Sequence, residues 1–207
     1  MVRAKVCGLT RETDVQAAVD AGADAVGFVA KVDVDTHREL EPARAEQLIE
    51  SVPPFVTSVL VTMPDTAAEA VTLAELVGAD AVQVHGLAPE DCTIAAMNFH
   101  GPVVAAVSTA EVAAYAHAAD ALLVDTPSEA GGGGTGETHD WTATRDAIEG
   151  LDTPVVLAGG LTPENVTEAI ETVDPFAVDV ASGVEAADGT KDHDAVCAFV
   201  TRAQEAR

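Results

Sequence analysis

The sequence is poor in basic residues. Lys and Arg together number 10, against 35 Asp and Glu, which gives a formal net charge of −25 at pH 7. Nucleic acids and anionic membranes attract basic surfaces, so this balance argues against both as partners. At molar salt the Debye length falls to about 3 Å, and the repulsion between so many carboxylates is screened. Because aromatic residues are also scarce, at 3% of the chain, the composition favours a cell with very high internal salt over an ordinary one.

Cysteines are few and poorly suited to pairing. The three of them, Cys7, Cys92 and Cys197, are odd in number and far apart, which is typical of reduced thiols in a cytoplasmic protein. Cys92 and Cys197 fall in amphipathic segments rich in Ala and Val. We expect both of these side chains to be buried as small core residues.

Long apolar segments are missing as well. Met1 leads directly into a short strand-like segment, without the pattern of a signal peptide. The longest uncharged stretch, residues 92–110, is interrupted near its centre by Gly101 and Pro102. We interpret it as the end of a helix, a turn and a strand, and not as a membrane span.

The chain alternates short apolar segments with Ala-rich amphipathic segments from end to end. Runs of four to eight apolar residues are typical of strands that are covered on both faces. We expect eight strands, at residues 4–9, 25–30, 55–63, 81–86, 103–108, 121–126, 154–159 and 177–181. Eight similar units without a linker predict one α/β domain over residues 1–207, and favour a closed (β/α)₈ barrel over an open doubly wound sheet.

The helices between these strands have recognisable starts. Amphipathic segments include residues 12–21, 42–51, 66–77, 89–99 and 165–173. We expect Thr162 to cap a helix that has Pro163 at its first position, and Asp140 to cap the helix that begins at Trp141.

Polar residues inside the apolar strands share one face. Residues two apart in a strand point to the same side, and the flanking positions (Val6, Val84, Val124 and Val178) are β-branched and suited to face the helices. The polar residues are therefore expected to point into the barrel, at Lys5, Cys7, Gln83, His85, Asp125 and Asp179. Burying charge is costly unless it is paired or used. A structural ion pair between Lys5 and Asp179 is one interpretation, and a functional site at the carboxyl ends of the strands is the other.

A thiol and a carboxylate at the ends of opposed strands can act as a base and an acid. Cys7 would need thiolate character near neutral pH, and the charge of Lys5 on the same face would favour it. Asp125 would need to be protonated part of the time, which partial burial favours.

Two glycine-containing turns follow the last two strands. Gly159 and Gly160 come after the seventh strand, and Ser182 and Gly183 after the eighth. In barrels of this class these loops commonly bind phosphate through free backbone N–H groups. The glycine-rich segment 131–136 formally spells G-x-G-x-x-G, but no acidic residue ends the next strand. We therefore interpret it as a loop over the site and not as a dinucleotide fingerprint.

The six histidines are dispersed and show no ligand spacing, so we predict no metal site. His85 differs from the others because it is expected at an inward-facing strand end.

Motifs spread over nearly the whole chain, from Lys5 to Asp192, resemble those of the phosphoribosylanthranilate isomerase family. They are Lys5-Val-Cys-Gly-Leu-Thr10, Gly22-Ala-Asp-Ala-Val-Gly-Phe28, Val82-Gln-Val-His-Gly86, Val124-Asp125, Gly133-Gly-Thr-Gly136 with Asp140-Trp141, Leu157-Ala-Gly-Gly-Leu-Thr-Pro-Glu-Asn165, and Asp179-Val-Ala-Ser-Gly-Val-Glu185 with Lys191-Asp192. The resemblance implies a closed (β/α)₈ barrel and an Amadori rearrangement without a cofactor. The substrate would be N-(5′-phosphoribosyl)anthranilate and the product 1-(2-carboxyphenylamino)-1-deoxyribulose 5-phosphate.

The same resemblance implies roles for individual residues. Asp125 would be the general acid that opens the ribose ring, and Cys7 the general base that removes the C2′ proton. Arg38 would bind the anthranilate carboxylate, although the segment after the second strand departs from the family pattern here. The remaining substrate-binding positions would be the phosphate-binding Gly159, Gly160, Ser182 and Gly183, with His85 and Asp179 lining the site.

Two alternatives stay open at this point. One is a related phosphate-binding barrel, such as indoleglycerol-phosphate synthase or a histidine-pathway isomerase. The other is a catalytically silent barrel that binds a phosphorylated ligand or a partner chain. Members of the resembled family occur as monomers and dimers, and no exposed apolar stripe in this sequence decides between them; we favour a monomer over a homodimer.

Overall fold

The computed structural model describes residues 1–125, 140–187 and 189–206. Parallel strands pair in sequence order, β1 with β2 and so on, and β8 pairs back with β1. This confirms the closed (β/α)₈ barrel. The strands are β1 (Arg3–Val6), β2 (Ala25–Val29), β3 (Thr57–Thr62), β4 (Ala81–His85), β5 (Val103–Val107), β6 (Ala121–Val124), β7 (Val155–Leu157) and β8 (Ala177–Val180).

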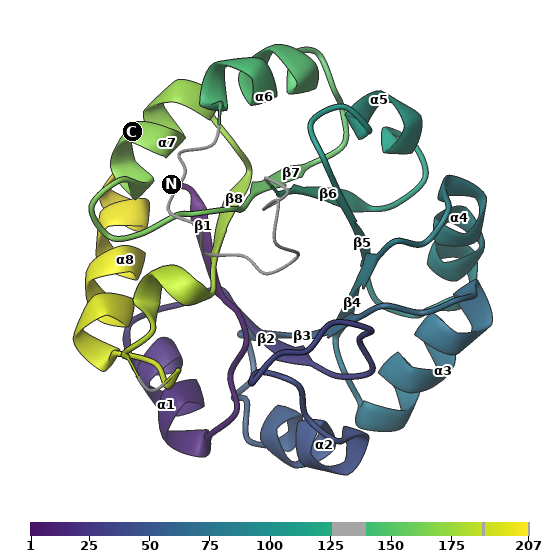
Figure 1. Cartoon of the computed structure of the whole chain (residues 1–207), viewed down its shortest axis with the longest axis horizontal. Coiled ribbons are helices and arrows are strands. Elements are labelled where there is room, and N and C mark those ends of the chain that lie inside the picture. The colour runs from purple at the N-terminus through teal and green to yellow at the C-terminus, as the bar shows by residue number, and fades with distance from the viewer. Residues whose placement is uncertain (126–139, 188, 207) are drawn as a thin grey trace.

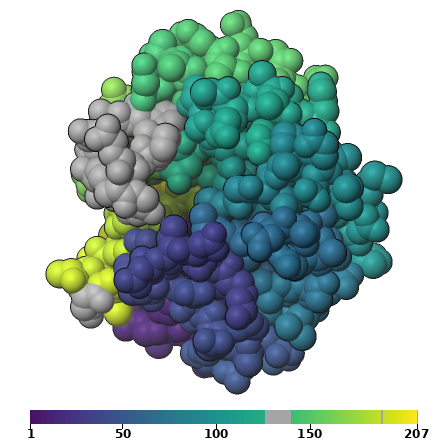
Figure 2. Space-filling view, turned by 45° about the vertical axis from the view of Figure 1, so that its right-hand side comes forward, coloured from purple at the N-terminus to yellow at the C-terminus, as the bar shows by residue number. Residues whose placement is uncertain are grey.

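Helices surround the barrel as an outer ring (Figure 1). They are α1 (Glu12–Asp20), α2 (Pro42–Glu50), α3 (Ala67–Val77), α4 (Pro89–Asn98), α5 (Val112–Tyr115), α6 (Trp141–Ile148), α7 (Val166–Val173) and α8 (His193–Glu205), and a 3₁₀ turn, η1 (Ser182–Val184), follows β8. Figure 2 shows the chain colours following one another around the molecule, because each β/α unit lies beside its neighbours in sequence. No helix in the described residues is long and apolar enough to cross a membrane.

The apolar core has two layers. The larger one lies between the sheet and the helices and contains Val6, Val84, Val124 and Val178, all at most 1% exposed. The smaller one fills the barrel interior and contains Cys7 with Val29, Val59, Val61 and Ala81. The alternation of side chains along each strand is therefore the predicted one, with polar residues on the interior face.

A repeated contact stabilises the amino-terminal end of the barrel. Asp24, Asp80 and Asp120 each stand directly before an even-numbered strand. Each carboxylate accepts a hydrogen bond of 2.9 Å from a backbone N–H at the start of the preceding odd-numbered strand. Because the N–H groups at the start of these strands would otherwise lack acceptors, the aspartates satisfy the backbone at the amino-terminal end of the barrel.

Two local predictions are wrong. Thr162 caps only the turn that begins at Pro163, since its Oγ1 accepts from the Glu164 N–H at 3.2 Å, whereas α7 itself begins at Val166 and not at the predicted position. Cys197 is exposed, since α8 turns Val196, Phe199 and Val200 inward and leaves the next position facing solvent. Cys92 is fully buried as expected. Asp140 does cap α6, accepting from the Ala143 N–H at 3.0 Å.

Candidate active site

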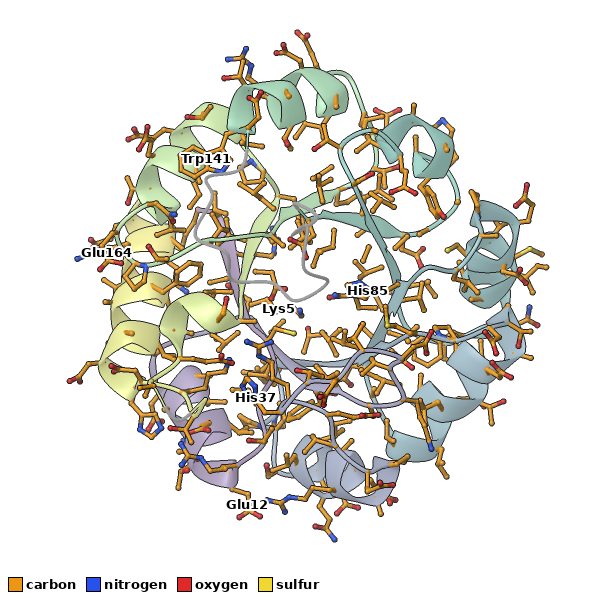
Figure 3. All side chains as sticks on the ribbon, viewed as in Figure 1. Lys5, Glu12, His37, His85, Trp141 and Glu164 are labelled. Atoms are coloured by element: carbon orange, nitrogen blue, oxygen red, sulfur yellow. The ribbon has the colours of Figure 1, made fainter. Side chains whose placement is uncertain are left out.

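A cavity of about 790 Å³ opens at the carboxyl-terminal ends of the strands. Five of the predicted site residues line it together, namely Cys7, Arg38, His85, Asp125 and Asp179. They come from four strands and from the segment after β2, so only the closure of the barrel brings them to one place. In Figure 3 Lys5 and His85 point into the barrel interior, whereas Glu12 and Glu164 lie on its outside.

Cys7 lies directly after β1 and is 6% exposed. Room for its sulfur comes from Gly27 on the neighbouring strand, since a Cβ at Gly27 would stand 2.7 Å from Cys7 Sγ. Burial raises the pKa of the Cys7 thiol, and the positive charges of Lys5 and Lys191 act in the opposite direction. The Cys7 side chain is therefore fixed by packing, and formation of its thiolate depends on the charges of Lys5 and Lys191.

Lys5 and Asp179 form the ion pair that the sequence suggested. Their Cα positions are in register between β1 and β8, and Lys5 Nζ lies 2.9 Å from Asp179 Oδ1. Burial alone would lower the pKa of Lys5, but the charges of Asp179 and Cys7 outweigh it and the pKa lies above its usual value. The two interpretations are thus compatible, because Asp179 lines the cavity and Lys5 places a positive charge near Cys7.

Gln83 links this pair to His85. Lys5 Nζ, which can only donate, bonds Gln83 Oε1 at 3.1 Å, so the amide nitrogen of Gln83 faces His85 Nε2 at 2.9 Å. His85 Nε2 must then accept, and its proton resides on Nδ1. Burial and the charge of Lys5 lower the pKa of His85 to about 4. His85 is therefore a neutral hydrogen-bond donor over the physiological range.

Asp125 follows β6 and is half-buried, and its backbone N–H donates to Val107 O at 3.0 Å. The ladder between β5 and β6 thus fixes the position of this carboxylate at the rim of the cavity. The glycine-rich segment 131–136 and His139 lie outside the described residues.

Arg38 lies on the loop between β2 and α2, and its guanidinium is bound by Glu185 of the β8–α8 loop. Arg38 Nε and Nη2 donate to Glu185 Oε1 and Oε2, both at 2.7 Å. Lys191 Nζ donates to Glu185 Oε1 at 2.8 Å and to Ala181 O at 2.9 Å. Neither Glu185 nor Lys191 has a role predicted from sequence, although both fall in the motifs quoted and Lys191 is one of only three lysines.

The two predicted phosphate loops pack against each other. A Cβ at Gly183 would stand 1.8 Å from the carbonyl oxygen of Leu161, so glycine is required where the β8 loop crosses the β7 loop. Gly159 and Gly160 both have positive φ, and within the described residues their N–H groups donate to no protein acceptor. Gly159, Gly160, Ser182 and Gly183 do not line the cavity of Cys7 and Asp125, but they follow strands β7 and β8 at the same end of the barrel.

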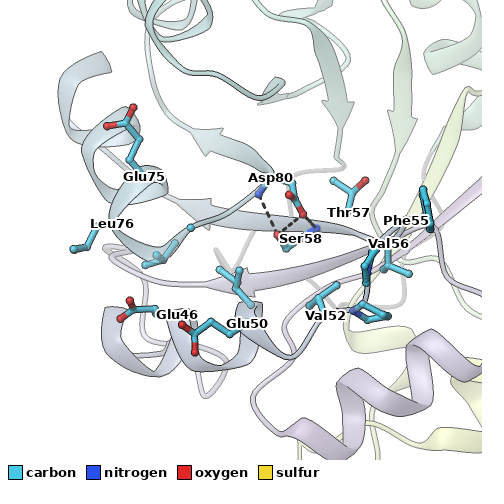
Figure 4. A pocket seen from close by; sticks show the side chains of 15 residues that line it. Glu46, Glu50, Val52, Phe55, Val56, Thr57, Ser58, Glu75, Leu76 and Asp80 are labelled. Carbon is cyan, nitrogen blue, oxygen red and sulfur yellow. Dashed lines mark hydrogen bonds between the residues drawn. The ribbon is translucent and has the colours of Figure 1, made fainter.

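A second cavity, of about 770 Å³, lies at the opposite end between α2 and α3 (Figure 4). Its lining includes Glu46, Glu50 and Glu75, and its Asp80 carboxylate is already bonded to the Ser58 N–H and hydroxyl. Within the part of the chain that the structure describes, its lining is acidic and includes no thiol, histidine or cation, so nothing there pairs a base with a positive charge as Cys7 and Lys5 do. Among the described residues, no group of three or more His, Cys, Asp or Glu side chains is placed to hold a metal ion.

Comparisons with known proteins agree with this site. The sequence pattern of the family described as N-(5′-phosphoribosyl)anthranilate (PRA) isomerase matches residues 4–202. Relatives from halophilic archaea carry the same name, and that of Haloarcula marismortui is 57% identical over 100% of this chain and 98% of its own. Their source supports the high-salt origin inferred from composition.

Solved structures give the same result. The phosphoribosyl anthranilate isomerase of Thermotoga maritima superimposes with a TM-score of 0.84 at 37% identity, covering 99% of both chains. Another isomerase structure, in complex with reduced 1-(o-carboxyphenylamino)-1-deoxyribulose 5-phosphate, gives 0.80 at 35% identity, again over 99% of both chains. These matches decide against the related barrels and the silent barrel. The chain belongs to the N-(5′-phosphoribosyl)anthranilate isomerase family, and it catalyses this isomerisation in tryptophan biosynthesis.

Proposed function

We propose that the isomerisation proceeds by general acid–base catalysis with Asp125 as the acid and Cys7 as the base. Asp125 donates a proton to the ribose ring oxygen, and the C1′–O bond breaks to give a protonated Schiff base. The Cys7 thiolate then removes the C2′ proton, which leaves an enolamine that tautomerises to the ketone. One proton is given and one is taken, so exchange with solvent restores both groups.

One observation carries this proposal: Cys7 and Asp125 line the same cavity from opposite sides of the barrel, directly after β1 and β6. A substrate bound between them would meet an acid on one side and a base on the other. The ammonium of Lys5, held by Asp179 and Gln83, stabilises the thiolate by its charge. No cofactor is needed for these steps.

The remaining predicted residues would bind the substrate. The Gly159–Gly160 and Ser182–Gly183 loops would accept the phosphate on backbone N–H groups. Arg38 would bind the anthranilate carboxylate, for which a guanidinium is well shaped. His85 would donate its Nδ1 proton to a substrate oxygen, and Asp179 would line the sugar site. The ligand of the solved isomerase complex is both phosphorylated and carboxylated, which supports this division.

Fluorescence of the anthranilate group tests the proposal. Phosphoribosylanthranilate is generated in place, at roughly 2–3 M KCl and in dilute buffer, and its decay is followed. Cys7→Ala and Asp125→Asn are expected to lower kcat by about 10²–10⁴-fold while affinity for the reduced product analogue is kept. Cys197→Ala, which removes an exposed thiol on α8, is the matched control and should leave kcat unchanged. Full activity of Cys7→Ala would refute the base assignment.

The pH dependence gives a second test. Because burial raises the pKa of Cys7, the thiolate fraction at neutral pH is small. We expect kcat/KM to rise with pH through the neutral range, and Lys5→Met to shift this rise to higher pH. A kcat/KM that falls with pH there would contradict a thiolate base.

We further propose that residues 1–207 act as a single-domain monomer in the cytoplasm. One solved relative, the isomerase of Thermotoga maritima, is dimeric, and monomers generated from it have also been solved, so this barrel can fold without a partner chain. Sedimentation in high salt is expected to give one species near the chain mass of 21.1 kDa. A species of twice that mass would overturn the monomer.

A further inference from the structure

The guanidinium of Arg38 has two edges that can bind a carboxylate. One is formed by Nε and Nη2, and the other by Nη1 and Nη2. Glu185 occupies the first edge with both of its oxygens, at 2.7 Å each. Within the described residues, Nη1 has no protein acceptor. The edge that contains Nη1 thus remains available to a ligand.

Glu185 is itself held firmly. Its Oε1 accepts from Lys191 Nζ, whose side chain is only 1% exposed and is also bonded to the Ala181 carbonyl. His37 Nε2 approaches Oε2 at 3.5 Å and is labelled in Figure 3. Burial alone would raise the pKa of Glu185, but its hydrogen bonds to Arg38 and Lys191 outweigh burial and the pKa lies below its usual value. Glu185 therefore remains a carboxylate at neutral pH.

Arg38 is also confined on the side of Cys7. A Cβ at Gly8 would stand 2.5 Å from Arg38 Cδ and 3.3 Å from its Nε, so the side chain lies directly against the backbone next to Cys7. Arg38 and Cys7 line the same cavity. The guanidinium therefore has few orientations open to it, because Gly8 packs against the Arg38 side chain and Glu185 binds its Nε–Nη2 edge.

The charges of this cluster favour an anion. Arg38 and Lys191 contribute two positive charges and Glu185 one negative charge, which leaves a net charge of about +1 beside the cavity. This stands out in a chain whose formal charge is −25. Without Lys191, Glu185 would cancel the charge of Arg38 and repel a substrate carboxylate.

We propose that Glu185 is a positioning residue for recognition of the substrate carboxylate. By binding the Nε–Nη2 edge of Arg38, it turns the Nη1–Nη2 edge toward the cavity, where the benzoate group of the substrate is received. Lys191 fixes Glu185 and keeps the cluster positive. This inference rests on the proposed role of Arg38 and extends it to two residues without an assigned role.

A pair of ligands tests the inference. One is the reduced product analogue that carries the carboxyl group, and the other is the same phosphorylated anilino-sugar alcohol without it. Their affinity ratio measures carboxylate recognition alone. We expect the unaltered protein to prefer the carboxylated ligand by roughly tenfold to a hundredfold, the range for hydrogen bonds to charged groups. Arg38→Lys should abolish most of this preference, because an ammonium cannot form the bidentate contact.

The decisive variant is Glu185→Gln. It is expected to lower the preference by roughly tenfold while leaving the affinity for the decarboxylated ligand and for inorganic phosphate unchanged. In turnover, KM for phosphoribosylanthranilate should rise more than kcat falls. The double variant with Arg38→Lys should be no worse than Arg38→Lys alone. Glu185→Asp keeps the charge for Lys191 but shortens the reach to Arg38, so it should give an intermediate ratio even where Glu185→Gln fails to fold.

The possible failures are distinguishable. If Arg38→Lys abolishes the preference and Glu185→Gln and Glu185→Asp do not change it, Arg38 binds the carboxylate but Glu185 does not position it. If the Glu185 variants weaken binding of phosphate and both ligands equally, Glu185 only supports the β8–α8 loop, and the inference is overturned. If Arg38→Lys leaves the preference intact, the proposed role of Arg38 is wrong and the inference falls with it.

Discussion

The two ends of the barrel use the same residue type for opposite purposes. At the amino-terminal end, Asp24, Asp80 and Asp120 each accept a backbone N–H of the neighbouring strand. At the carboxyl-terminal end, Asp125 and Asp179 border a cavity together with Cys7. One set satisfies the sheet, and the other borders the cavity in which we propose that the substrate binds.

The difference follows from what each end contains beside its carboxylates. At the amino-terminal end each aspartate accepts from a backbone N–H group, which does not titrate. At the carboxyl-terminal end the neighbours are cations. Lys5 and Lys191 act to lower the pKa of the Cys7 thiol, and Arg38 and Lys191 lower the pKa of the Glu185 carboxyl group. Carboxylates therefore indicate catalysis only where the surrounding groups can titrate or bind an anion.

The largest expected effect comes from removing one aspartate at each end of the barrel and comparing stability with activity. Asp80→Ala removes the acceptor of the Ser58 N–H and of its hydroxyl proton, and Ser58 is 2% exposed, so the free energy of unfolding should fall by about 1–3 kcal/mol. The folded variant should keep its kcat. Asp125→Asn should show the reverse, with a loss of about 10²–10⁴-fold in kcat and little change in stability. Denaturant titration and the fluorescence assay on both variants measure this, and parallel losses in both properties would contradict the distinction.

A smaller effect is expected from acid. The pKa of His85 is lowered to about 4 in the folded protein, against an ordinary value near 6.5. The unfolded chain thus binds a proton that the folded one does not, so stability present above pH 6.5 is lost as the pH falls toward 4. A shift of this size corresponds to roughly 3 kcal/mol.

His85→Asn isolates that contribution. Between pH 7 and pH 4 its free energy of unfolding should decline by roughly 3 kcal/mol less than that of the parent protein. Replacement of His117, an exposed histidine before β6, is the control for the loss of a histidine side chain as such. Equal slopes for His85→Asn and the parent would show that His85 titrates normally.

The smallest of these effects is expected at Gly27. A methyl group there would stand 2.7 Å from Cys7 Sγ and must displace it, so Gly27→Ala should lower kcat/KM by roughly tenfold. Gly78→Ala is the control at the other end, because nothing lies within 4 Å of its Cβ position and only its positive φ is strained. It should cost about 1 kcal/mol of stability and no activity. An unchanged kcat/KM for Gly27→Ala would mean that the thiol position is not critical.

Much of this site could be predicted because strand alternation is local. Lys5 and Cys7 are two residues apart, as are Gln83 and His85, so a strand necessarily turns each pair to one face. The turns that hold Gly159 and Gly183 were likewise readable from residue type. The prediction for Cys197 was wrong because it rested on the types of its neighbours, whereas the helical spacing of Val196, Phe199 and Val200 places the inward stripe one position away.

The sequence by itself determined the eight alternating units, the interior face of each strand and the family motifs, since these depend on periodicity and on residues close in the chain. Only the tertiary structure decided which distant groups meet. Arg38 and Glu185, 147 residues apart, form a pair that no motif indicated, and the Lys5–Asp179 pair, 174 residues apart, was one of two interpretations until β1 and β8 were placed in register. Their contacts arise because closing the barrel places β1 beside β8, and no local pattern encodes the distance across that closure.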